Sequence, residues 1–169
     1  MKLIEKIVTG TANVLAVAGL AILLMLAAFT LLDGLLRSLA NFPLDLVREI
    51  GDLVAAISGA CCLPIVLLCR NNITLRLFDN LLSEKLARIV DIFASTLVWI
   101  VMIGMAWQFY LFSMKTLNAH DVTWLLNVPK APFWFVVDAV LWVGVAVQTF
   151  VVIQDITGKR TVQSQEPIA

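Results

Sequence analysis

Asp138 interrupts a long apolar segment, APFWFVVDAVLWVGVAVQTFVVI, at residues 131–153. An ionisable side chain in an apolar helix of this length costs about 2.5–3.5 kcal/mol on membrane-insertion scales and usually faces protein or water. It can relay a proton or an ion, join two helices, or reach toward the membrane surface. If the helix begins near Pro132, Asp138 lies only about 9 Å inside that end. This shallow depth favours a polar contact between helices or subunits over a relay at the midplane.

A second group of ionisable residues, in DLVREIGDL at 45–53, precedes another apolar segment. On a helix Arg48 and Asp52 are four residues apart and Glu49 and Asp52 are three apart, so each pair shares a face. Three interpretations stay open. The group is a solvated helix start with acids at the positive end of the dipole, a surface that docks another protein, or a carboxylate pair that binds an ion.

Metal and nucleophile chemistry has little support in the sequence. Cys61, Cys62 and Cys69 fall within one apolar run, and the only histidine, His120, lies far from them. A structural zinc site takes four thiolate or imidazole ligands, and a haem with paired histidines needs a second His. We therefore predict no enzyme, no catalytic residue, no metal site and no cofactor, with the cysteines acting as small apolar side chains.

The composition is that of a membrane protein. The 169 residues are 61% apolar and 14% charged, with a mean hydropathy of +0.96, whereas soluble domains are about 45–50% apolar and about 25% charged. Four segments reach the about 20 residues that cross about 30 Å of hydrocarbon, at roughly 12–32, 52–69, 89–112 and 132–153. Lipid satisfies no unpaired backbone group, so these spans must be helices. We predict one all-α, four-helix membrane domain at 1–155, followed by a cytoplasmic tail at 156–169.

The distribution of basic residues predicts the orientation, because cytoplasmic loops carry an excess of Lys and Arg. One side holds eight such residues: Lys2, Lys6, Arg70, Arg76, Lys85, Arg88, Lys159 and Arg160. The other side holds four: Arg37, Arg48, Lys115 and Lys130. Both termini are therefore expected in the cytoplasm. Two amphipathic segments, at 1–10 and 72–93, are expected along the inner leaflet, unless the second extends the third span.

Aromatic and small residues predict where the helices meet water and one another. Trp124, Trp134 and Tyr110 lie near the expected outer ends, at the headgroup level that amphipathic rings prefer. Trp99 and Trp142 lie deeper, where we expect them to pack. The run SGACC at 58–62 consists of small side chains that let another helix approach closely.

Over roughly residues 10–155 the sequence resembles the DctQ-like small membrane subunits of tripartite ATP-independent periplasmic (TRAP) transporters. The stretch LLRSLANFPLDLVREIGDL places an Arg, a Pro and a Glu as that family does, although a Trp of the family pattern is missing. RNNITLRLFDNLL keeps a basic residue and two aliphatic residues, with Asn72 and Arg76 where the family has His and Asp. DVTWLLNVPKAPFWFVVD matches the lead into the last span. The matching residues are Arg37, Pro43, Glu49, Arg70, Ile73, Leu75, Asp121, Leu126, Val128 and Pro129.

The resemblance implies a non-catalytic subunit in the inner membrane of a bacterium. Its partners would be a large membrane subunit, which holds the sodium and substrate sites, and a periplasmic protein that delivers an organic acid anion. The small subunit would brace the first and help dock the second. On this basis we predict interface residues at Arg37, Glu49, Asp52, Asn72, Asp121, Pro129 and Asp138.

Two other function classes remain to be weighed. A membrane anchor of a redox complex would need histidines for haem or quinone, and the chain has one. A small oligomeric transporter or channel would rely on Asp138. The sequence names neither the substrate nor the helix faces that meet a partner rather than lipid.

Overall fold

The structure, a computed structural model, describes residues 2–40, 45–69, 84–124 and 126–157. These residues form four long helices: α1 (Lys2–Ala40), α2 (Asp45–Cys69), α4 (Glu84–Asn118) and α5 (Ala131–Thr157). Each helix is long and apolar enough to cross a membrane. The predicted all-α membrane fold with four spanning helices is therefore confirmed.

The helices are longer than the spans expected from hydropathy. α1 has 39 residues and α4 has 35, which correspond to about 60 Å and about 50 Å of helix. The first amphipathic segment continues into α1 without a break, and residues 84–93 of the second form the first turns of α4. Residues 72–83 of that second segment lie outside the described residues. Hydropathy marks only the part of a helix that suits hydrocarbon, and nothing in these flanks stops the helix.

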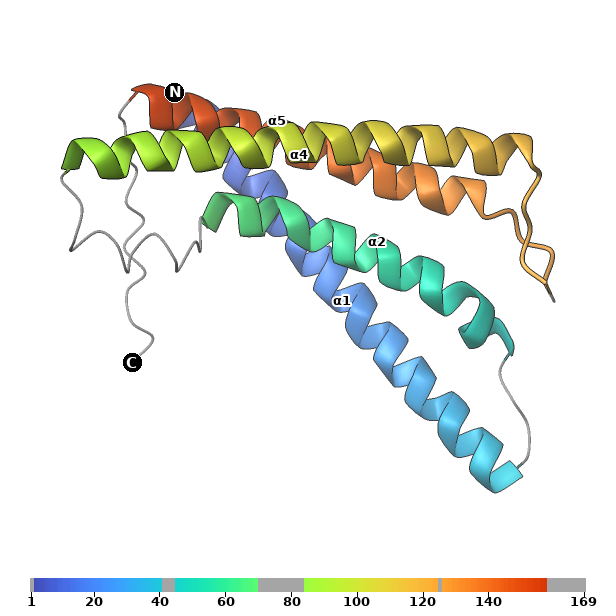
Figure 1. Cartoon of the computed structure of the whole chain (residues 1–169). Coiled ribbons are helices and arrows are strands. Elements are labelled where there is room, and N and C mark those ends of the chain that lie inside the picture. Colours follow the sequence, from blue (N-terminus) through green and yellow to red (C-terminus); the bar gives the residue numbers. More distant parts are fainter. Residues whose placement is uncertain (1, 41–44, 70–83, 125, 158–169) are drawn as a thin grey trace, which may run out of the picture.

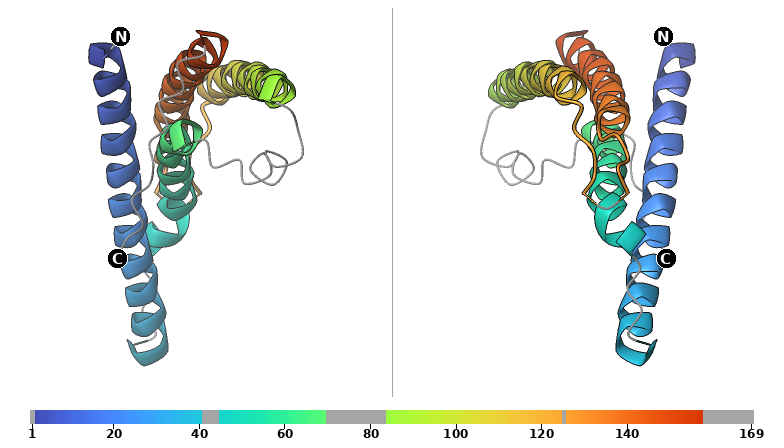
Figure 2. Two further views of the ribbon diagram at one scale, coloured as in Figure 1. Left: turned by 90° about the vertical axis from the view of Figure 1, so that its left-hand side faces the viewer. Right: turned by 90° about the vertical axis from the view of Figure 1, so that its right-hand side faces the viewer.

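The four helices form an open row rather than a closed bundle. α1 packs on α2, α2 on α5, and α5 on α4, and this order is visible in two perpendicular views (Figures 1 and 2). α5, with helices on two sides, has 50% of its most apolar stretch buried, whereas α1 and α4 have 6% and 11% buried. The two outer helices of the row therefore leave most of their apolar surface uncovered.

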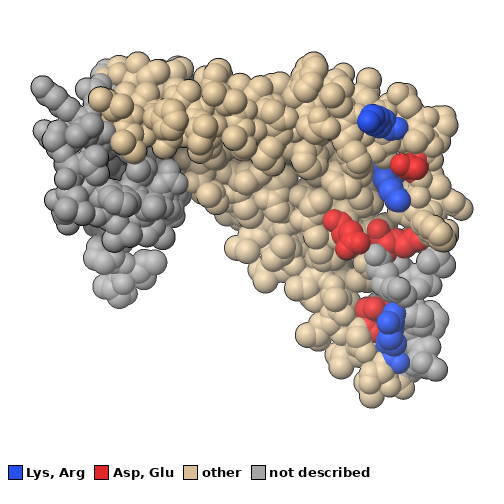
Figure 3. Space-filling view, in the orientation of Figure 1, with Lys and Arg blue, Asp and Glu red and all other residues tan. Residues whose placement is uncertain are grey.

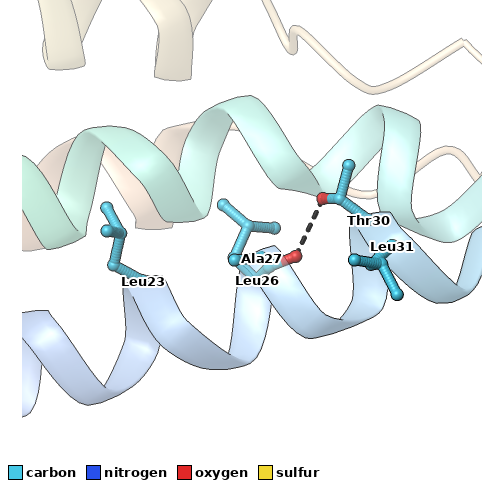
Figure 4. A pocket seen from close by; sticks show the side chains of 5 residues that line it. All are labelled: Leu23, Leu26, Ala27, Thr30 and Leu31. Atoms are coloured by element: carbon cyan, nitrogen blue, oxygen red, sulfur yellow. Dashed lines mark hydrogen bonds between the residues drawn. The ribbon is translucent and has the colours of Figure 1, made fainter.

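The contact between α1 and α2 depends on Gly19. The Ser58 hydroxyl donates a 2.7 Å hydrogen bond to the Gly19 carbonyl, and a Cβ atom at Gly19 would lie 2.7 Å from Cβ of Cys61. The small side chains at 58–62 thus admit a neighbouring helix, as predicted. Further along α1, a shallow apolar hollow of about 460 Å³ opens (Figure 4). Its lining residues are Leu23, Leu26, Ala27, Thr30 and Leu31.

Polar side chains join α4 to α5 in the half of the pair nearest the N-terminus of α4. The Trp99 indole donates to Oγ1 of Thr149 at 2.8 Å, and the Gln148 amide donates to the Ser95 carbonyl at 3.0 Å. The Ser95 hydroxyl donates to Oδ2 of Asp155 at 2.5 Å. Such bonds between membrane helices contribute about 0.6 kcal/mol each on average, so they select the register more than they stabilise the pair.

The other half of the α4–α5 contact is apolar and aromatic. Met102, Ala106 and Leu141 are buried there, and the rings of Phe112 and Trp134 meet edge to face with centroids 5.1 Å apart. Trp99 packs as expected. Trp142, which was also expected to pack, is 42% exposed within this chain.

Candidate functional site

The described residues between α4 and α5, 119–124 and 126–130, form a short hairpin, here named the α4–α5 hairpin. Val122 and Pro129 pair as an antiparallel bridge. The backbone N–H of Thr123 donates to the Val128 carbonyl at 2.9 Å, and that of Lys130 donates to the Asp121 carbonyl at 3.0 Å. Two predicted interface residues, Asp121 and Pro129, are thus parts of one folded loop.

Local geometry shapes the turns of this hairpin. His120 and Asn127 have φ values of 50° and 51°, in the left-handed region, and they are the non-glycine residues with positive φ in the described part of the chain. Asn and His enter this region more readily than most residues. Near the turn the Val128 N–H donates to Oγ1 of Thr123 at 3.0 Å, and Thr123 is only 3% exposed. The buried threonine therefore holds the turn from inside.

Glu49 attaches the hairpin to α2. Its Oε2 atom accepts a 2.9 Å hydrogen bond from the backbone N–H of Leu126. Asp52, about one turn further along α2, is exposed. One of the three interpretations of this segment has the two acids bind an ion as a pair. In the structure Glu49 accepts a bond from a loop, and Asp52 is exposed.

Trp124 occupies the turn of the hairpin and is 95% exposed. Val122 and Leu126, two residues to either side, are also exposed, while Thr123 between them is buried. We call Val122, Trp124 and Leu126 the apolar tip. Sequence reasoning placed Trp124 only at the membrane surface and missed the tip. The sequence signal for a tight turn here is the Asn-Val-Pro run at 127–129. It combines a residue that tolerates a positive φ with a proline, which lacks a backbone N–H.

Charged side chains surround this end of the molecule. In the view of Figure 3, the visible Lys, Arg, Asp and Glu gather over the hairpin, the start of α2 and the end of α1, while the middle of the same face has none. Lys115, Asp121 and Asp52 are exposed here. On α1 the Arg37 guanidinium lies 3.9 Å from the Asp33 carboxylate, one turn earlier. Five predicted residues, Arg37, Glu49, Asp52, Asp121 and Pro129, therefore lie at the end of the molecule where α1 ends and α2 begins.

Asp138 is separate from this group. It lies about two turns into α5, is 6% exposed, and its Oδ1 atom has no hydrogen-bond partner among the described residues. A buried acceptor without a partner costs about 1–3 kcal/mol. This chain already covers Asp138 almost completely. Another subunit could contact the carboxylate only at the small part of it that α5 leaves exposed.

The remaining predictions concern Asn72, Arg48, the cysteines and a possible metal site. Asn72 lies outside the described residues, as does the Arg48 side chain. Within the described ranges no three His, Cys, Asp or Glu side chains approach closely enough to hold a metal ion. Cys61 is buried against Gly19, in keeping with a small apolar packing residue.

Comparison with known protein families identifies the chain. Residues 25–160 match the family described as "Tripartite ATP-independent periplasmic transporters, DctQ component", a range that begins within α1 and includes α2, α4, α5 and the hairpin. Comparisons with curated proteins and with solved structures give no match. Because the family match covers more than half of the sequence, the chain belongs to the DctQ family, the small membrane components of TRAP transporters.

Proposed function

We propose that this DctQ subunit is a non-catalytic part of a sodium-coupled importer of an organic acid anion in a bacterial inner membrane. It braces the large membrane subunit and helps to dock the periplasmic substrate-binding protein, with both of its own termini in the cytoplasm. The sodium and substrate sites belong to the large subunit in this proposal. The resemblance to the family supports the sodium coupling and the substrate class, and the Lys and Arg distribution supports the orientation.

The bracing role rests mainly on one observation, an amide on the uncovered face of α4. Gln108 is exposed, although it lies near the middle of the apolar stretch Ile92–Asn118. Gly104, one turn earlier on the same face, has nothing within 4 Å of the place where a Cβ would be. Glycine allows a second helix to approach closely, and an amide can hydrogen-bond across such a contact.

Lipid is a poor neighbour for this face of α4. Hydrocarbon offers the Gln108 amide no hydrogen-bond partner, whereas a helix packed close to Gly104 could supply one. The uncovered middle of α1 differs, since its exposed side chains there include Val17, Leu24 and Met25, which suit lipid. We therefore assign α4 to the large subunit and α1 mainly to the bilayer.

Co-purification in mild detergent tests the bracing role. A tagged chain should bring down a much larger polytopic membrane protein, and Gly104→Leu should reduce the amount recovered by blocking the close approach. Ala21→Leu is the matched control, because it adds similar bulk to the exposed side of α1 and should leave recovery unchanged. A wild-type chain that purifies alone and supports uptake when reconstituted alone would refute the proposal.

The docking role rests on the position of the α4–α5 hairpin. In Figure 1 this segment lies beyond the ends of α4 and α5 and reaches toward the start of α2, and the orientation predicted from the basic residues puts it on the periplasmic side. Uptake by reconstituted complexes should therefore rise saturably with the concentration of binding protein. Uptake that needs no binding protein would contradict this role.

A further inference from the structure

The apolar tip of the α4–α5 hairpin has no evident use within the chain. Trp124 is 95% exposed, and Val122 and Leu126 are 42% and 40% exposed. A tryptophan buries about 150–250 Å² when it is covered. An exposed tryptophan between two exposed aliphatic side chains has the composition of a binding hot spot.

The tip is held in place before any partner arrives. Thr123 and Val128 exchange two bonds, of 2.9 and 3.0 Å, and Glu49 holds Leu126 from α2 at 2.9 Å. A partner that binds a preformed loop loses less conformational entropy than one that must order it. Because Glu49 accepts a hydrogen bond from within its own chain, it acts as a positioning residue for the tip.

The position of the tip argues against a role in the aromatic belt of the membrane. The belt level on α5 suits Trp134, which lies in the first turn and packs on Phe112. Lys130 is the last residue of the hairpin and directly precedes α5, and Lys115 lies in the last turn of α4. These two lysines flank the turn of the hairpin in the sequence, and Figure 1 shows the hairpin beyond the ends of α4 and α5. We therefore place Trp124 on the aqueous side of both lysines.

We propose that Val122, Trp124 and Leu126 insert into an apolar pocket of the soluble substrate-binding protein. Asp52, Asp121 and Lys115 are exposed at the same end of the molecule, and in this proposal they supply the polar rim that protein interfaces usually have. This inference rests on the proposed docking function and refines it: the contact is an apolar anchor, and the acids at the start of α2 are not its centre. Glu49 serves the contact only by holding the loop.

The test is uptake by proteoliposomes that contain both membrane subunits, measured across a titration of the binding protein. Trp124→Ala should raise the concentration for half-maximal uptake about tenfold or more, without changing the maximal rate or the amount of large subunit in the complex. Trp124→Phe should fall between it and the wild type. Trp142→Ala, which removes another exposed tryptophan, is the matched control and should behave like the wild type.

Each other outcome has a distinct meaning. A wild type without saturable dependence on the binding protein would refute the docking function itself. A wild type that saturates and a Trp124→Ala variant identical to it would overturn only the tip as the anchor. Loss of the large subunit from Trp124→Ala complexes would assign the tip to that subunit, and a lower thermal stability with an unchanged titration would assign Trp124 to the stability of this chain. Both results overturn the inference.

Discussion

The backbone N–H of Leu126 donates a 2.9 Å hydrogen bond to Oε2 of Glu49, although the two residues are 77 positions apart. This bond joins the start of α2 to the loop between α4 and α5. Most of the predicted interface residues lie at this same end of the molecule. Glu49 therefore holds the hairpin against α2. The first prediction follows from it.

Glu49→Ala should loosen the α4–α5 hairpin, because the Leu126 N–H loses its acceptor. A net hydrogen bond contributes about 0.5–1.5 kcal/mol, so amide hydrogen exchange in residues 119–130 should accelerate about two- to tenfold. Glu49→Gln keeps an oxygen that can accept the bond and should exchange like the wild type. Asp52→Ala, on the neighbouring turn, is the control. Equal exchange in all three variants would mean that the bond does not order the hairpin.

Gly19→Val should destabilise the packing of α1 on α2. The added Cβ would lie 2.7 Å from Cβ of Cys61 and 2.9 Å from the Ser58 carbonyl oxygen, so the helices must move apart at a cost of about 1–3 kcal/mol. Thermal unfolding in detergent measures this loss as a lower Tm. Gly34→Val adds the same side chain on the same helix, where nothing lies within 4 Å, and should leave Tm nearly unchanged. A Gly19→Val variant as stable as Gly34→Val would contradict the close contact.

Asp138→Asn should change stability by less than about 1 kcal/mol, because Oδ1 has no hydrogen-bond partner among the described residues and an amide of similar shape fits the same buried place. The sodium dependence of uptake by the whole transporter should stay the same, since Asp138 is not assigned to ion transport. Thermal unfolding and a sodium titration measure the two effects. A shifted sodium dependence would instead assign Asp138 to an ion relay, the alternative that its shallow position in the sequence disfavours.

The sequence predicts the parts of this fold that depend on local apolarity. Runs of about 20 apolar residues indicated four helices, and SGACC at 58–62 indicated a close helix contact. Hydropathy underestimated α1, because residues 2–10 and 33–40 continue the helix on either side of the most apolar segment. An apolar run marks the hydrocarbon layer, whereas the helix ends where its backbone hydrogen bonds end.

The relationships between distant segments were out of reach of the sequence. No local pattern in residues 45–53 predicts that Glu49 accepts a hydrogen bond from Leu126. In the same way, no local pattern distinguishes Trp142, which is exposed, from Trp99, which is hydrogen-bonded to Thr149. The open row of helices was equally hidden, because all four apolar segments would also suit a closed bundle. In lipid an apolar side chain is stable either against protein or against hydrocarbon, so apolarity does not tell the two apart.

In the proposed function, this subunit braces the large membrane subunit through the Gly104 and Gln108 face of α4. The most direct measurement is photo-crosslinking in native membranes, with a photoreactive amino acid placed at position 108 and, as the control, at position 24 on the exposed side of α1. We predict an adduct between this chain and the large subunit from position 108 and none from position 24. An adduct from position 24 alone, or none from position 108, would contradict the account.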